Sequence, residues 1–365
     1  MPSTATARAS LAALCLMPTL ASAQLVLLDE IQITASDDLE SVEIAGDTAI
    51  VSHRTDGLQS FVDITSPFSM TLCPSTTFNP SFGDIFGESL YYDGLGGHLF
   101  TGHRFGGLTM NDASDPCATM FQVAAVNTQY MHEGLDAWSD GTNHFLVYGE
   151  HPAFTTVGGI RIYDIGASSL TEIGNVLNPA GQLDGGDVVF SPDGAYVYQI
   201  SPSGYGPGST TVNNTALVVY DTSNKSAPAF LFPVDLPGSA QSTDAELVHA
   251  PDSPYLYLAM FEDGLQVVNV TNPMAPTVKQ FFALPGISIE EVEFYHPKIL
   301  LTSGRIIETG QSVIVPLNVS DPDNPIILGV ISAGGRVRDI KVDNGLVYVA
   351  TTNTALNNNA LQVYL

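Results

Sequence analysis

Short apolar segments alternate with polar turns along this chain, and one arrangement of the two recurs over almost its whole length. In each copy an apolar strand ends in Asp or Asn, and a turn rich in Ser, Thr and Pro follows. The clearest copies are GLQVVNVTNPMAP from Gly264 and VIVPLNVSDPDNP from Val313. The strand-ending positions, 47 to 57 residues apart, are Asp63, Asp112, Asp164, Asp221, Asn269, Asn318 and Leu365. Such a period predicts a supersecondary unit repeated seven times.

The polar residue that ends each strand has a structural role in this interpretation. The side-chain oxygen of Asp or Asn can accept a hydrogen bond from the turn backbone, and Pro restricts the conformation after it. We expect turn caps here rather than metal ligands, because the positions are spread over separate units.

Each unit contains four short strands, which are clearest in the fifth unit. There, residues 245–249, 255–260, 265–270 and 278–284 are mainly apolar, and turn dipeptides such as Asp263-Gly264 separate them. No long segment has the 3.6-residue apolar period of a helix. The pattern therefore predicts an all-β fold, a seven-bladed β-propeller of four-stranded blades.

The two ends of the repeat array are complementary. The seventh copy stops after its third strand, while residues 25–33 (LVLLDEIQI) precede the first complete unit and resemble the fourth-strand segment 326–331 (IILGVI). Pairing of this N-terminal strand with the last blade would close the ring and remove a sheet edge. An open solenoid of β units is the alternative.

The copies resemble LVIVD repeats, a family of secreted or surface-associated bacterial and archaeal propellers. The pattern L-x-V-V-[DN]-[VI]-[ST]-x-P is carried by residues 265–273 and, with more drift, by the copies at Asp63, Asp221 and Asn318. The third copy lacks the Pro after Asp164. The resemblance implies the propeller fold and says little about function.

The first 23 residues have the features of a secretory signal peptide. Arg8 precedes the apolar run 11–20, and Ala21-Ser22-Ala23 forms an A-x-A cleavage site. Cleavage would leave one propeller domain at residues 24–365, in a secreted, periplasmic or cell-surface protein. A buried N-terminal helix is the alternative. No other segment is long and apolar enough to span a membrane.

Charge is sparse and almost all of one sign. Charged residues make up 13% of the chain, with 38 Asp and Glu against 11 Lys and Arg, for a net charge of −27. Loss of Arg8 with the signal would make it −28. Nucleic acid is therefore excluded as a partner, because phosphates need a basic surface. A self-repelling surface favours a monomer. The expected ligand is a protein, a polysaccharide or a small molecule.

Two cysteines remain after the signal peptide. Cys73 and Cys117 both follow the repeated turn, near the start of the fourth strand in adjacent units. In an oxidising compartment they predict one disulfide, with two separate thiols as the alternative.

An acidic pattern enters the first strand of most units, which is the innermost strand of a propeller blade. Equivalent carboxylates would form a ring around the axis and repel one another, which a hard cation such as Ca²⁺ would relieve. No cofactor is certain, and a solvated, partly salt-bridged channel is the alternative. The seventh unit carries Arg338 and Lys341 in the pattern, which we expect between the acids of units six and one. The candidate metal ligands are Glu40, Glu88, Glu133, Asp184, Asp244 and Glu290.

Reactive side chains recur where the second strand of a unit leads into the third. These loops open on the same face as the start of the first strand, because neighbouring strands are antiparallel. Polar residues facing water are the alternative to a binding site. The candidate ligand-binding residues are His53, Arg54, His103, Arg104, Glu150, His151, Tyr205, Glu262 and Arg305.

The sequence thus favours a secreted, non-enzymatic binding or scaffold module with its ligand surface at this acidic mouth. The rival hypothesis is a metal-assisted hydrolase or lyase at the same mouth, with His53, His103 or His151 as ligand or base. An enzyme needs two or three such groups to converge on one point, whereas a binding module spreads them around the rim.

Overall fold

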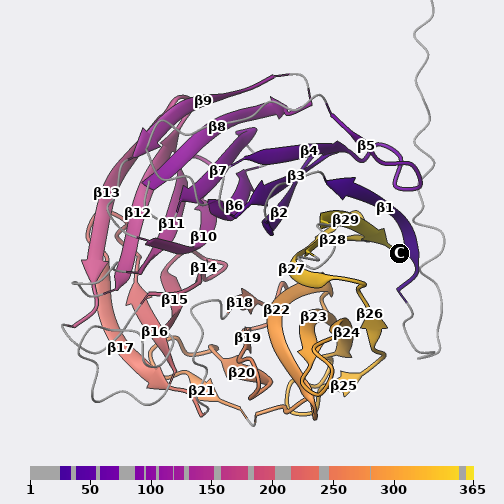
Figure 1. Cartoon of the computed structure of the whole chain (residues 1–365). Coiled ribbons are helices and arrows are strands. Elements are labelled where there is room, and N and C mark those ends of the chain that lie inside the picture. The colour runs from indigo at the N-terminus through magenta and orange to yellow at the C-terminus, as the bar shows by residue number, and fades with distance from the viewer. Residues whose placement is uncertain are drawn as a thin grey trace, which may run out of the picture.

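The structure is a computed structural model that describes residues 25–33, 38–54, 58–73, 87–93, 96–103, 107–117, 119–126, 131–151, 158–179, 185–201, 215–237, 246–279, 281–352 and 359–365. All regular elements in these ranges are β-strands, and together they form seven sheets (Figure 1). Within the same ranges, no helix is long and apolar enough to cross a membrane.

The strands follow one another in groups of four along the chain. Blades one to four contain β2 (Leu39–Ala45), β3 (Thr48–His53), β4 (Gln59–Asp63), β5 (Thr71–Leu72), β6 (Gly87–Asp93), β7 (His98–His103), β8 (Gly107–Asp115), β9 (Thr119–Val126), β10 (Met131–Ser139), β11 (His144–His151), β12 (Gly159–Gly166), β13 (Ser169–Leu177), β14 (Val188–Phe190), β15 (Tyr196–Ser201), β16 (Ala216–Asp221) and β17 (Ala229–Asp235).

The last three blades follow the same order. They contain β18 (Leu247–His249), β19 (Tyr255–Ala259), β20 (Leu265–Asn269), β21 (Thr277–Val278), β22 (Ile287–His296), β23 (Ile299–Ile306), β24 (Ser312–Asn318), β25 (Ile326–Ile327), β26 (Ile331–Ser332), β27 (Arg336–Asp343), β28 (Leu346–Thr352), β29 (Asn359–Tyr364) and the N-terminal β1 (Leu27–Ile33).

Each sheet is an antiparallel meander whose first strand lies nearest the centre of the ring. In Figure 1 the strands β2, β6, β10, β14, β18, β22 and β27 surround the axis, and later strands of each blade lie progressively further out. The predicted seven-bladed β-propeller is confirmed. First strands begin and second strands end at the same end of the ring, and we call this end the channel mouth.

Blade seven combines the two ends of the described chain. Its sheet has the order β1-β29-β28-β27, so the N-terminal strand is its outermost strand. The β1–β29 pairing runs antiparallel from Leu27 opposite Tyr364 to Ile33 opposite Asn359. Next to it, the backbones of Val26 and Leu365 exchange hydrogen bonds of 2.9 and 3.0 Å.

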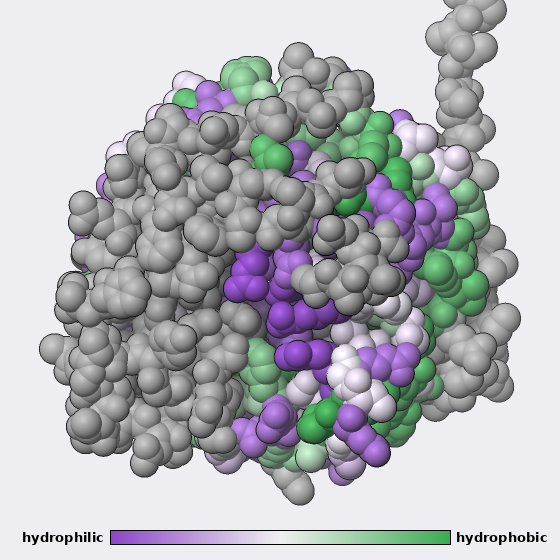
Figure 2. Space-filling model, viewed as in Figure 1, coloured by the Kyte–Doolittle hydropathy of each residue, from purple (hydrophilic) through white to green (hydrophobic). Residues whose placement is uncertain are grey.

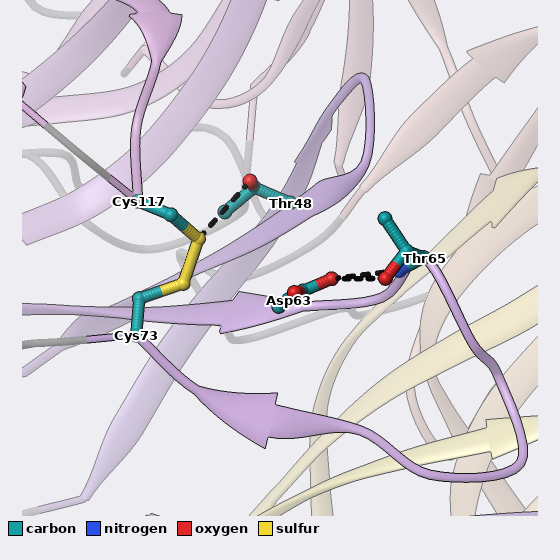
Figure 3. The surroundings of a disulfide bond; sticks show 5 residues. All are labelled: Thr48, Asp63, Thr65, Cys73 and Cys117. Atoms are coloured by element: carbon teal, nitrogen blue, oxygen red, sulfur yellow. Dashed lines mark hydrogen bonds between the residues drawn. A yellow bond between two sulfur atoms is a disulfide. The ribbon is translucent and has the colours of Figure 1, made fainter. Parts of the chain in front are cut away.

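The Asp and Asn residues that end the third strands cap the following turns. Asp63 Oδ1 accepts hydrogen bonds from the Thr65 amide at 2.9 Å and the Thr65 hydroxyl at 2.6 Å (Figure 3). The amide two residues on donates in the same way to Asp112, Asp221, Asn269 and Asn318. The turn caps are therefore confirmed at Asp63, Asp221, Asn269 and Asn318, whereas Asp112 makes the same contact within β8. Asp164, which lacks the following Pro, instead lies within β12 opposite Thr171.

The apolar core fills the spaces between neighbouring sheets. Between blades two and three, for example, Phe100 and Met110 of one sheet pack with Leu146, Tyr148 and Tyr163 of the next, and all five are fully buried. Each blade therefore depends on its neighbours for burial, which is characteristic of repeat architectures.

A disulfide links blades one and two. Cys73, directly after β5, is bonded to Cys117, just before β9, with Cα atoms 5.2 Å apart (Figure 3). Thr48 Oγ1 lies 3.4 Å from Cys117 Sγ. The predicted disulfide is confirmed, and closing a loop with a sequence separation of 44 residues stabilises the fold by about 4 kcal/mol in a chain-entropy estimate.

Candidate binding site at the channel mouth

The first strand of most blades has a β-bulge close to the channel mouth. Such an insertion rotates the side chains that follow it relative to an ideal strand, and it is a common way of re-aiming a side chain. The acidic pattern coincides with this irregularity. The register shifts lie between Leu39 and Val42, Gly87 and Ser89, His132 and Leu135, Ile289 and Glu291, and Val337 and Asp339.

Four axial carboxylates, of which Asp136 and Asp339 follow such a bulge, join neighbouring blades around the axis. Asp339 Oδ2 accepts the backbone N–H of Val42 in the next blade at 2.8 Å. Three further acids accept an N–H from the following blade in the same way. The pairs are Asp136 with Phe190 at 2.7 Å, Asp187 with Leu247 at 3.0 Å, and Glu246 with Val292 at 3.1 Å.

Three of the axial carboxylates converge on one point. Glu246, Glu291 and Asp339 each offer an oxygen, and these atoms lie within 4.8 Å of one another. Burial near the axis raises the pKa of Glu291 well above its ordinary value, and the nearby Glu246 carboxylate raises it further. Oxygen donors in this arrangement suit a hard cation.

Lys341 provides a positive charge to the same set of carboxylates. Burial alone would lower the pKa of its ammonium group, but Glu43, Asp339 and Glu293 raise it well above the ordinary value. Its Nζ atom lies 3.9 Å from Glu43 Oε2. The acidic channel is therefore at least partly neutralised by a residue of the chain itself.

The converging acids differ from the ones selected from the sequence. Glu40 and Glu290 are described, but both lie outside the three-carboxylate cluster and pair with arginines. Glu88 and Glu133 lie in β6 and β10, and their side chains fall outside the described part of the chain. Asp184 and Asp244 lie outside the described residues. The sequence nonetheless contained a signal for the axial acids that link the blades. The same acidic pattern includes them, mostly as its second carboxylate: Asp136, Asp187, Glu246 and Asp339.

Glu290 holds two arginines at the channel mouth. Its carboxylate is 3% exposed. Arg305 Nε, at the end of β23, donates to Oε1 at 2.5 Å, and Arg336 Nε and Nη2, at the start of β27, donate to Oε2 at 3.4 Å. We call these three residues the Glu290 cluster. The two guanidinium groups come from different blades and meet at one carboxylate.

Glu40, the equivalent residue of blade one, has a similar arrangement. Arg338 Nη1 lies 3.6 Å from Glu40 Oε2, and Arg54 Nε lies 3.8 Å from the same oxygen. Arg338 Nη2 also donates to Asp38 Oδ2 at 2.6 Å. We call these four residues the Glu40 cluster. The expectation that Arg338 would also face Glu290 is wrong, since Arg305 and Arg336 occupy that place.

The two arginine clusters lie next to each other because blade seven supplies one arginine to each. Strand β27 stands between β22 and β2 in the ring, with Arg336 directed to Glu290 and Arg338 to Glu40. Figure 2, which has the same viewpoint as Figure 1, shows hydrophilic residues gathered at the centre of the ring, over the region of β22 and β27.

The histidines predicted in the mouth loops are buried at strand ends instead. His53, the last residue of β3, is 3% exposed, and its Nε2 atom lies 2.9 Å from Ser60 Oγ. His103, the last residue of β7, is 1% exposed and pairs with Thr109 Oγ1 at 3.1 Å. Burial lowers the pKa of His103 to about 4. This histidine is therefore neutral near pH 7 and points into its own blade.

Glu150 is also part of the blade interior. Its carboxylate is 1% exposed and accepts hydrogen bonds from Arg161 Nε and from the Tyr148 hydroxyl. Burial raises the pKa of Glu150, while Arg161 opposes that rise. Arg161 also donates to Glu172 at 2.8 Å. The group acts as a structural ion pair within blade three.

The remaining predicted site residues are less informative. Glu262 is exposed in the turn between β19 and β20. His151 ends β11, and its side chain falls outside the described part of the chain. Arg104 and Tyr205 lie outside the described residues. Of the nine predicted ligand-binding residues, the structure thus places Arg54 and Arg305 in the two arginine clusters.

Comparison with known families agrees with the repeat pattern. The family model of the LVIVD repeat matches residues 211–235 and 253–283. The chain carries LVIVD repeats. The first matched segment includes β16 and β17 of blade four, and the second includes β19, β20 and β21 of blade five. One LVIVD repeat therefore covers the outer part of a blade.

Solved structures with a similar fold are themselves propellers. The β-propeller domain of Cps50 (Swd1) from Myceliophteria thermophila has 12% sequence identity and a TM-score of 0.68, over 93% of this chain and 99% of that one. Sqt1 from Saccharomyces cerevisiae has 13% identity and a TM-score of 0.59, over 89% of this chain and 82% of its own. No curated protein matches the chain significantly by sequence. At these identities the likeness concerns the fold alone.

Proposed function

We propose that the protein is a secreted, non-enzymatic binding or scaffold propeller whose ligand surface is the channel mouth at blades six, seven and one. One observation carries this proposal. Half-exposed arginines from three blades gather at the mouth of a protein that otherwise has few basic residues. Arg54 and Arg336 have side chains 34% exposed, and that of Arg305 is 42% exposed.

The buried histidines favour binding over catalysis at the mouth. A general base or a metal ligand must reach its substrate or ion. His53 and His103 are instead bonded within their own blades to Ser60 and Thr109. Loops and strand ends at one mouth of a rigid scaffold are common places for binding residues.

Secretion is supported by two independent features. The disulfide between Cys73 and Cys117 is typical of an oxidising compartment. The signal-peptide pattern at residues 1–23 would deliver the chain to such a compartment.

A combined binding and turnover screen tests the proposal. The mature chain would be applied to arrays of polysaccharides and peptides, with retention and release of products both measured. We expect a retained ligand that is recovered unchanged. Formation of a product that depends on an added divalent metal would instead support the hydrolase or lyase hypothesis, and the absence of any retained ligand would contradict the binding hypothesis.

A further inference from the structure

We propose that Arg305 and Arg336 form a binding site for a single carboxylate group of the ligand. The inference rests on the proposed function, because it names the chemistry that the channel mouth recognises. Its basis is the arrangement of donors and charges around Glu290.

Basic residues are concentrated in one arc of the molecule. Five of the 11 Lys and Arg residues of the chain belong to the axial or mouth region of blades six, seven and one. The five residues are Arg54, Arg305, Arg336, Arg338 and Lys341.

The Glu290 cluster has hydrogen-bond donors to spare. A guanidinium group carries five N–H donors. Arg305 uses only Nε on Glu290, and Arg336 uses Nε and Nη2. Both Nη groups of Arg305 and Nη1 of Arg336 have no hydrogen-bond partner among the described residues. These side chains are 42% and 34% exposed, so the spare donors are accessible to a ligand.

The charge balance distinguishes the two arginine clusters. In the Glu290 cluster two guanidinium groups face one carboxylate, which leaves one positive charge. Among the described residues of the Glu40 cluster, Arg54 and Arg338 face Glu40 and Asp38, which are two charges of each sign. An anionic group is therefore attracted to the Glu290 cluster.

One remaining positive charge matches a monoanion. A second negative charge on the ligand would be repelled by the axial carboxylates below and by the net charge of the protein. A carboxylate also fits the planar donor edge of a guanidinium group through two parallel hydrogen bonds. A single carboxylate is thus a better match than a phosphate or a polyanion.

Glu290 acts in this site as a positioning residue. Its carboxylate is 3% exposed, and its two oxygens bind one arginine each. It therefore holds the two guanidinium groups side by side without blocking their outer donors. A ligand carboxylate would complete the group from the solvent side.

Titration of acetate into protein labelled with ¹⁵N-arginine tests the site directly. We expect the side-chain Nε–H resonances of Arg305 and Arg336 to shift along a saturable curve, while Arg161, paired with Glu150 and Glu172, stays unchanged. Arg305→Gln and Arg336→Gln, each made separately, should weaken acetate binding by about tenfold, because each removes one charge-assisted hydrogen-bonded pair between a guanidinium group and the acetate. The control Lys298→Gln removes an exposed charge from the opposite end of blade six and should leave the affinity unchanged.

The outcomes separate this inference from the proposed function. Linear shifts, equal shifts with chloride, or full affinity in both arginine variants would overturn the carboxylate site. Tighter binding of inorganic phosphate than of acetate would also overturn it, in favour of a dianion. If the arrays identify a ligand whose binding is insensitive to both variants, the binding role stands, while its place at the mouth and this inference both fail. If acetate binds saturably but the arrays retain no ligand, the carboxylate site stands and the proposed binding function fails.

Discussion

Single carboxylates connect neighbouring blades at the axis of this propeller. Asp339 shows how, because its two oxygens serve two strands. Oδ1 accepts the N–H of Ile340 in its own strand at 2.7 Å, and Oδ2 accepts the Val42 N–H at 2.8 Å and the Ser41 hydroxyl at 2.9 Å in the next blade. Hydrogen bonds to a charged acceptor are stronger than neutral ones, so one residue fixes the spacing of two blades.

Arg338 is the residue whose replacement should disturb the mouth most. Its side chain is 7% exposed and lies against Asp38 and Glu40. Arg338→Glu would place a third carboxylate against these two, and breaking a buried pair in this way should lower the free energy of unfolding by roughly 3–5 kcal/mol. Chemical denaturation at low and high salt measures the effect, which added salt should partly reverse.

The exposed residue Lys298 provides a control of equal charge change. Lys298→Glu, in the turn between β22 and β23, should alter stability little, as expected for a solvated charge. If Arg338→Glu and Lys298→Glu unfold at the same denaturant concentration, Arg338 contributes no more than a surface charge.

Glu293 should make stability dependent on pH. Burial raises its pKa to about 7; Lys341 opposes the rise, and Asp339, Glu246 and Glu43 add to it. Because this pKa is above the unfolded value, the carboxyl stabilises the fold below about pH 4.5, and that contribution is lost as the pH rises through about 7. Glu293→Gln, which stays neutral, should therefore gain stability over the wild type at about pH 8, on the order of 1–3 kcal/mol.

The measurement is the difference in unfolding free energy between the two proteins from about pH 5 to about pH 8. Titrations of groups that do not interact with Glu293, including that of His103, cancel in this difference. For Glu262→Gln, which replaces an exposed carboxylate, the difference in unfolding free energy from the wild type should not change with pH. If the difference for Glu293→Gln is also independent of pH, Glu293 is ionised over this whole pH range and is solvated like a surface group.

At the level of elements, three of the seven blades have a very short outer strand. The fourth strands β5, β21 and β25 have only two residues each. An outer strand exposes unpaired backbone groups that could pair with another molecule, and a short edge strand limits that risk. Blades two, three and four have longer outer strands, β9, β13 and β17, and in blade seven the outer strand is β1.

Removal of β1 should therefore expose an apolar edge. Strand β29, including the buried Leu361 and Val363, would lose its partner, together with the 2.6 Å hydrogen bond from Gln362 to Glu30. Compared with a chain that begins at residue 25, a chain that begins at residue 34 should aggregate or melt more than about 5 °C lower. Light scattering and calorimetry measure both effects. An unchanged melting temperature in a monomeric protein would show that β1 is dispensable for the ring.

The elements could be predicted from sequence because their signals are local. The strand-ending Asp and Asn, the Pro after them and the alternation of apolar residues all act within one unit. The bulges of the first strands could not be predicted in this way, since they depend on how each strand meets the next blade. A shift of one residue moves a side chain to the other face, which is why Asp136 and Asp339 line the axis.

The same limit applies to the histidines. The repeat pattern places His53 and His103 where the second strand of a unit leads into the third, and so predicts them in loops. In the structure β3 and β7 extend to include them, and Ser60 and Thr109 on the neighbouring strands satisfy their Nε2 atoms. A hydrogen-bond partner on another strand is a tertiary contact that no local pattern reveals.

At the level of the whole molecule, charge breaks the symmetry of the ring. The blades share one architecture, yet blade seven replaces the acidic pattern with Arg338, Asp339 and Lys341. Lys341 lies among axial carboxylates, while Arg336 and Arg338 face the mouth. This one blade therefore gives a protein of net charge −27 a local positive site. The asymmetry was visible in the sequence, but the division of the two arginines between Glu290 and Glu40 needed the structure.

The most direct test of the central claim, that the mouth at blades six, seven and one is the binding surface, is a calorimetric titration of a ligand retained in the array screen. Affinity would be compared among the wild type, Arg305→Gln and Lys298→Gln, all shown to be equally folded. We expect about tenfold weaker binding for Arg305→Gln, equivalent to about 1.4 kcal/mol, and no change for Lys298→Gln. Equal affinity in all three proteins would contradict it and place the binding surface elsewhere on the ring.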